Sequence, residues 1–118
     1  MRFRAPDESI WVARLRLVLH VPESRSLKDK RRVVNQVRDR LRAGRNLSVA
    51  EVGHLEHHSR AVMAVAMVGN EPRFLRSALD GVLGQIQGWH GFLVEEAEVE
   101  VSPVMSDDGL QDYDDLDG

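Results

Sequence analysis

The hydrophobic pattern of this chain switches between a period of two residues and a period of 3.6 residues, in a fixed order. A period of two places alternate side chains on opposite faces of a β-strand, whereas a period of 3.6 gives an α-helix one apolar face. Alternation is clearest over residues 10–21, where one face carries Trp11, Ala13, Leu15, Leu17, Leu19 and Val21. Pro22 follows and is expected to end this first strand.

A helix is predicted next, from residue 27 to about residue 43. Its apolar positions recur at helical spacing and are Leu27, Val33, Val34, Val37 and Leu41. Ser26 precedes the helix as a predicted N-cap, with Asp29 three residues later in a variant of the capping box. Gly44 is the expected terminator, because glycine readily adopts the left-handed conformation that ends many helices.

Four more elements complete the pattern. Strands are predicted over residues 47–52, 60–68 and 92–101. A second helix is predicted to follow Asn70 as its N-cap, with Pro72 in its first turn, and to end near Gly88. In the last strand, Leu93, Ala97, Val99 and Val101 are expected on one face, opposite Glu96, Glu98 and Glu100.

The resulting order is βαββαβ, which in 118 residues fits one domain. Two right-handed crossovers interleaved about a hairpin predict an α+β fold, the ferredoxin-like βαββαβ sandwich, with a four-stranded antiparallel sheet and both helices on one face. The domain is expected over residues 9–102, after a flexible N-terminal segment of residues 1–8.

Residues 103–118 are predicted to form a disordered acidic tail. Residues 95–118 contain ten Asp or Glu and no Lys or Arg, and the end of the chain has no strand or helix period. Two roles stay open for the six Asp between Asp107 and Asp117. The tail either folds back on basic residues and competes with nucleic acid, or only keeps the protein soluble.

Composition excludes several classes of protein. Cysteine is absent, which rules out disulfides, thiolate catalysis and cysteine-based metal sites and fits a reducing compartment. No apolar run approaches ~20 residues, so no membrane span is expected. The charged N-terminus lacks the apolar segment of a signal peptide. We therefore expect a cytoplasmic protein.

Positive charge is concentrated in the first helix. The chain has a net charge of −3, but residues 25–45 hold nine Lys or Arg and two Asp, a local charge of +7. Clustered cations of this kind indicate a phosphate-bearing partner, and the alternative is an ordinary solvated helix face. The predicted nucleic-acid-binding residues are Arg25, Lys28, Arg31, Arg32, Arg38 and Arg42. Lys30 instead falls in the apolar arc, so we expect a structural role, with its ammonium reaching solvent at the helix start.

Three segments resemble the YlxP-like family, a small bacterial family of uncharacterised domains. They are Ser26 to Arg32 (SLKDKRR), Asn46 to Val52 (NLSVAEV) and Val65 to Asn70 (VAMVGN), and the resemblance extends over about residues 10–102. It implies the same ferredoxin-like fold. Genes of this family often lie among translation and ribosome-maturation genes, so the resemblance also implies a role near RNA. We expect a non-enzymatic module that binds RNA, such as ribosomal RNA, or the ribosome, and uses no cofactor.

The uncovered face of the sheet offers a second hypothesis. Arg14, Arg16, Val18 and His20 would face outward from the first strand, next to the glutamates of the last strand. No aromatic side chains are expected there, so base stacking as in an RNA-recognition motif is not favoured. Cross-strand ion pairs are expected instead. A homodimer through this face would place Arg14 and Arg16 against the glutamate row of a second copy.

Two enzymatic or metal-binding alternatives have weaker support. His54, His57 and His58 lie in a polar loop near Glu51, but their spacing matches no recognised zinc motif, so no metal site is predicted. Acylphosphatases share the predicted fold and hold phosphate in a glycine-rich loop. Here the corresponding loop, residues 22–26, offers Arg25, which supports a phosphatase-like enzyme as the third hypothesis. The loop contains no glycine, so this hypothesis has the weakest support. No catalytic residues are assigned, and Trp11 and Trp89 are expected at the core or its rim.

Overall fold

The computed structural model describes residues 3–104, so the predicted tail beyond Val104 lies outside the described residues. The elements follow the predicted order and are β1 (Trp11–His20), α1 (Leu27–Arg42), β2 (Ser48–Gly53), β3 (Arg60–Gly69), α2 (Pro72–Gln87) and β4 (Leu93–Pro103). Most bounds agree with the hydrophobic periods to within one or two residues.

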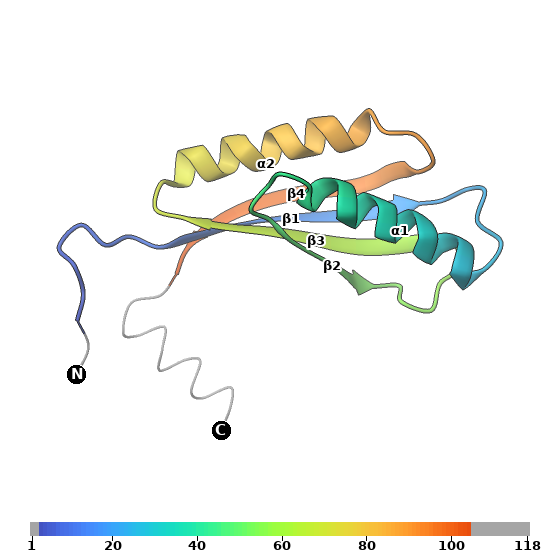
Figure 1. The fold of residues 1–118 in the computed structure, drawn as a ribbon, viewed down its shortest axis with the longest axis horizontal. Coiled ribbons are helices and arrows are strands. Elements are labelled where there is room, and N and C mark those ends of the chain that lie inside the picture. Colours follow the sequence, from blue (N-terminus) through green and yellow to red (C-terminus); the bar gives the residue numbers. More distant parts are fainter. Residues whose placement is uncertain (1–2, 105–118) are drawn as a thin grey trace, which may run out of the picture.

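The four strands form one antiparallel sheet in the order β2-β3-β1-β4. Both helices pack on the same face, with α1 over β2 and β3 and α2 over β1 and β4 (Figure 1). This arrangement confirms the predicted α+β ferredoxin-like fold. The opposite face, here called the open sheet face, is covered by no helix of residues 3–104.

The core lies between the sheet and the two helices. Alternate residues of β1 and β3 are fully buried there, including Leu15, Leu17 and Met63. The helices contribute Val34, Val37 and Leu41 from α1 and Leu75, Leu79, Val82 and Ile86 from α2. Burial of this apolar surface is the main force that holds the helices on the sheet.

The two helices begin and end as their sequences favour, with one difference. In α1 the backbone N–H of Asp29 donates to Oγ of Ser26 at 3.1 Å, and Gly44 follows the helix with φ of +67°. In α2 the predicted N-cap, Asn70, is wrong by one residue. Glu71 is the N-cap, and its carboxylate accepts the N–H of Arg73 at 3.4 Å. Pro72 consequently occupies the first helical position, where proline needs no N–H partner.

A β-bulge in β4 changes the face on which one predicted core residue lies. Val18 pairs with Glu96 and Leu19 pairs with Val94, so Glu95 is an extra residue between them. The bulge turns Val94 toward the helices and Leu93 toward the open sheet face, where Leu93 is exposed. The predicted inward position of Leu93 was therefore wrong, because a strict period of two cannot include an inserted residue.

Candidate nucleic-acid interface

The start of α1 is tied to the loop that precedes it. One carboxylate oxygen of Asp29 accepts the backbone N–H of Arg25 at 3.1 Å, while Ser26 caps the helix as described above. The hydroxyl of Ser24 is buried and donates to the carbonyl of His58, in the β2–β3 loop. These bonds fix the position and direction of α1, and with them the positions of its basic side chains.

The six predicted nucleic-acid-binding residues lie on α1 and immediately before it. Five of them are exposed, and their side chains make no hydrogen bond or ion pair within residues 3–104; these are Arg25, Lys28, Arg31, Arg32 and Arg42. The sixth, Arg38, is half-buried, and its Nε lies 3.4 Å from Oδ1 of Asp39. The outer surface of α1 therefore presents several cations that no carboxylate of the described chain neutralises.

Lys30 differs from the other cations of α1 because its side chain is fully buried. Its ammonium lies 2.8 Å from Oε2 of Glu51 and donates to the carbonyls of His54 at 2.7 Å and Leu55 at 3.4 Å. The prediction of a structural role fits these contacts, but the expectation that the ammonium reaches solvent was wrong. The ammonium donates two hydrogen bonds to the loop carbonyls and is neutralised by the carboxylate of Glu51, so the charge can remain inside.

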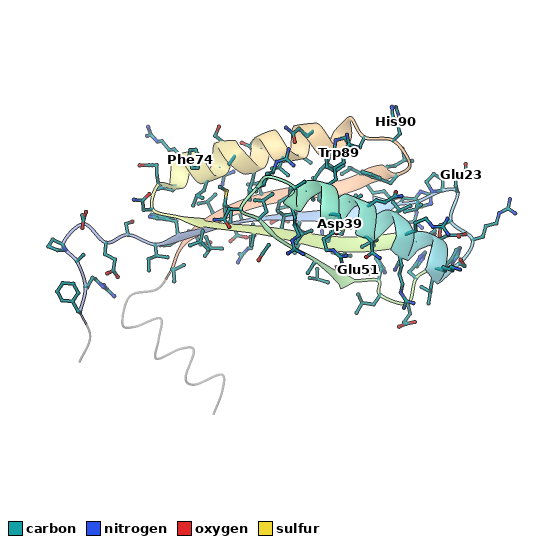
Figure 2. The ribbon with its side chains drawn as sticks, in the orientation of Figure 1. Glu23, Asp39, Glu51, Phe74, Trp89 and His90 are labelled. Atoms are coloured by element: carbon teal, nitrogen blue, oxygen red, sulfur yellow. The ribbon has the colours of Figure 1, made fainter. Side chains whose placement is uncertain are left out.

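Glu51 and the histidine loop complete this buried corner. Oε2 of Glu51 is buried and makes no hydrogen bond within the described chain, so its contact with the Lys30 ammonium is an ion pair. His54 adopts a positive φ of 55°, which directs its carbonyl and that of Leu55 to the same ammonium. Lys30 therefore joins α1, β2 and the β2–β3 loop. Figure 2 shows Glu51 at the lower side of α1, near the end of β2.

His57 acts as a hydrogen-bond acceptor in the same loop. Its Nδ1 accepts the backbone N–H groups of Ser59 at 3.1 Å and Arg60 at 3.0 Å, and its ring stacks on His58. Desolvation is the largest cause of a pKa for His57 below its usual value, and the nearby histidines and Arg60 add to it. The neutral imidazole is therefore the form that the loop requires.

The described residues contain no group of three or more His, Asp or Glu side chains placed to hold a metal ion. The three histidines of the loop contact one another through their rings, with His54 edge-on to His57. Glu51, the carboxylate expected near them, instead pairs with Lys30.

The charged half of the open sheet face is paired within the chain. Arg14 lies 2.7 Å from Glu100 and Arg16 lies 2.8 Å from Glu96, as the sequence predicted for β1 and β4. The hydrogen bond from Arg14 lowers the pKa of Glu100. The bulged residue Glu95 also finds a partner, because Arg60 of β3 reaches it at 2.8 Å and lowers its pKa by hydrogen bonding.

The other half of this face is largely apolar, a feature that was not predicted from the sequence. Every open-face residue of β3 between Arg60 and the end of the strand is Val or Ala, namely Val62, Ala64, Ala66 and Val68. Val52 of β2 lies beside them and is 55% exposed, while Val68 is 64% exposed. A shallow hollow of about 260 Å³ lies between Val52, Ala64 and the stems of Arg14 and Arg16. Most solvated sheet faces are polar, so this strip is unusual.

Together these features define a two-layer α+β domain with ferredoxin-like topology, a basic first helix and a half-apolar open sheet. The chain belongs to the family described as "Protein of unknown function (DUF503)", whose model matches residues 12–99. A comparison with curated proteins finds no match. No helix in the described part of the chain is long and apolar enough to span a membrane.

Proposed function

We propose that this protein is a non-enzymatic, cytoplasmic, YlxP-like module that binds RNA or the ribosome through the basic surface of α1. The observation that carries the proposal is the set of exposed cations on and before this helix that have no partner within residues 3–104. Unpaired cations on an acidic protein favour a polyanion, because binding releases the counterions condensed on its phosphates. The contacts would be to phosphate, so the module would bind without reading sequence.

Salt dependence provides the first test. We expect the affinity for a fragment of ribosomal RNA, measured by fluorescence anisotropy, to fall steeply as salt is raised. For single strands the slope of log K against log salt is about −0.7 per phosphate contact, so five contacts would give about −3.5. A slope near zero would contradict the proposal.

Charge reversal at matched positions provides the second test. The double variant R31E/R42E changes the net charge by four units on α1, and R73E/R76E makes the same change on exposed positions of α2. We expect R31E/R42E to abolish binding and R73E/R76E to weaken it only slightly. Equal losses would mean that net charge alone, and not the surface of α1, attracts RNA.

A second candidate function is self-association through the open sheet face, favoured by the apolar strip on β3 and β2. A two-fold axis along β3 would place the strips of two copies against each other. The ion pairs Arg14–Glu100 and Arg16–Glu96 would then lie at the rim. An apolar centre with a polar rim is the usual composition of a protein interface. The dimer expected from the sequence placed Arg14 and Arg16 against the glutamates of a second copy. Glu100 and Glu96 already pair with these arginines within one chain. The dimer proposed here therefore rests on contact between the two apolar strips instead.

Light scattering at increasing micromolar concentrations tests this candidate. We expect a dimer in the parent protein and a monomer in the variant V52D/V68D. The control is F74D, which places the same charge on an exposed side chain of α2, away from the sheet (Figure 2). A parent protein that stays monomeric, or a dimer that survives V52D/V68D, would exclude this interface.

A further inference from the structure

Arg40, an exposed basic residue of α1 outside the predicted site, is held against an aromatic ring. Its guanidinium carbon lies over the ring of Trp89, 4.1 Å from the ring centre. Trp89 is half-buried against the core, and its backbone N–H donates to the carbonyl of Ile86 at 3.0 Å. The ring is therefore a fixed support, and the cation–π contact restrains the guanidinium above it.

Arg40 itself remains exposed. A guanidinium is planar, and an exposed one can offer a face to a ligand while its carbon stays over the Trp89 ring. Arginine planes, like aromatic rings, stack on nucleobases in single-stranded RNA. An arginine already restrained by a ring loses less side-chain entropy when a base stacks on it, so the arrangement is preorganised for such a contact.

A groove runs from Arg40 along α1 toward the helix start. A small hollow beside Trp89 is lined by Val33, Gln36, Val37, Arg40, His90, Gly91 and Phe92. It adjoins a larger hollow of about 340 Å³, which shares Val33 and Gly91 with it and is lined further by Val21, Glu23, Ser24, Asp29 and Arg32. Figure 2 shows Trp89 between α1 and the end of α2, His90 pointing outward from the α2–β4 loop, and Glu23 farther along on the same side.

The two ends of this groove have different chemistry. Arg32, unpaired within residues 3–104, lies eight residues before Arg40, which corresponds to about 12 Å along a helix. The carboxylate of Asp29 is engaged by the N–H of Arg25, whereas Glu23 has no partner in the described chain and can accept a hydrogen bond. The groove thus combines a stacking plane, a phosphate-binding cation and an acceptor suited to a ribose hydroxyl.

We propose that this groove binds a nucleotide of single-stranded RNA, with the base stacked on the outer face of the Arg40 guanidinium and a neighbouring phosphate on Arg32. The proposal rests on the RNA-binding function proposed above and adds a contact to the base. Phosphate contacts on α1 would supply most of the affinity, and the groove would make binding depend on an unpaired base. It follows that single strands bind better than duplexes of equal charge.

Three probes and one conservative variant test the groove. The probes are a labelled hexamer of adenylate, a hexamer of the same ribose-phosphate chain without bases, and free AMP. We expect the parent protein to bind the adenylate hexamer about tenfold or more tightly than the abasic one, since stacking contributes measurably for each base. R40K keeps the charge but removes the plane. It should lose this preference and bind the abasic hexamer unchanged.

R76K is the matched control, because it makes the same substitution at an exposed position of α2, and it should retain the preference for bases. Two results would overturn the groove: no preference for the adenylate hexamer in the parent, or equal losses for both hexamers in R40K. AMP bound as tightly as the hexamer would assign the groove to a free nucleotide and also overturn the proposal. If neither hexamer binds, the RNA-binding function itself fails. Salt-sensitive binding without a base preference rejects only the groove.

Discussion

The ammonium of Lys30 lies 2.8 Å from Oε2 of Glu51, inside the protein and between α1 and β2. Replacing Lys30 with Met would remove the ion-pair partner of that carboxylate and the hydrogen-bond donor of two loop carbonyls. Breaking a buried ion pair from one side typically destabilises a protein by about 3–5 kcal/mol. We therefore expect K30M to lower the free energy of unfolding by an amount in this range, as measured by urea denaturation.

The matched control is K28M, two residues earlier on the exposed side of α1, which should change stability by no more than about 0.5 kcal/mol. The double variant K30M/E51L removes both charges and should recover part of the loss, although the carbonyls of His54 and Leu55 remain unpaired. If K30M and K28M have the same free energy of unfolding, the buried ion pair does not stabilise the contact between the loop and α1.

Acidification should destabilise the protein through His57. The folded-state pKa of His57 is lower than its unfolded value, which is about 6.5, so the unfolded chain binds a proton more readily. The contribution of neutral His57 to stability is full above the unfolded pKa and decreases as the pH falls below it toward the folded pKa. Urea denaturation at a series of pH values from 8 down to 5 should show this decline.

Asparagine at position 57 provides the control for the pH effect. Its side-chain oxygen can accept the N–H groups of Ser59 and Arg60 as Nδ1 does, but it does not titrate. We expect H57N to fold and to show a flatter profile over the same range. Loss of the Glu95 and Glu100 ion pairs belongs to a lower pH range, because their pKa values are depressed. A decline as steep in H57N as in the parent would assign the effect to other groups.

Ser26 should stabilise the protein through its cap on α1. Its hydroxyl oxygen accepts the N–H of Asp29, and replacing an N-cap serine with alanine typically costs about 1 kcal/mol. We expect S26A to lose about this amount and S26D, which retains an acceptor, to lose little. Thermal unfolding of the two variants makes the comparison. Equal stability of S26A and the parent would show that the cap contributes nothing measurable.

Two glycine positions should respond to alanine in opposite directions. A Cβ on Gly69 would lie 3.0 Å from Cδ2 of Leu75, a side chain that is buried in the core. A Cβ on Gly84, in the last turn of α2, would meet no atom within 4 Å. We expect G69A to destabilise by about 1–3 kcal/mol through overpacking. We expect G84A to stabilise by about 0.5–1 kcal/mol, because alanine favours helix. Urea denaturation of both variants shows whether each substitution raises or lowers the free energy of unfolding. A G69A variant that is more stable than the parent would contradict the predicted overpacking against Leu75.

Much of the fold could be predicted because the spacing of apolar residues within each segment indicates whether it forms a helix or a strand. The apolar spacing of α1, the cap at Ser26 and the terminator at Gly44 all appeared where the structure has them. The bulge at Glu95 could not be found this way, because an inserted residue depends on how β4 pairs with β1. For the same reason Leu93 was placed on the wrong face.

For the candidate site, the sequence predicted which cations of α1 are exposed but not which residues they contact. Helical spacing separates the exposed cations of α1 from Lys30, since the period of the helix decides which side chains point away from the core. The partners of those side chains do not follow from spacing. Glu51 is 21 positions from Lys30, and Trp89 is 49 positions from Arg40, so no local pattern connects either pair.

The sequence by itself determined the order of the elements, the face that each helix buries and the concentration of positive charge on α1. These properties depend on residues a few positions apart, whose relative directions are set by backbone geometry. Only the tertiary structure decided that Lys30 is enclosed by Glu51 and two carbonyls, that Arg40 rests on Trp89, and that one half of the open sheet is apolar. Such contacts join distant segments, and they arise from strand register and from the packing of helices on the sheet.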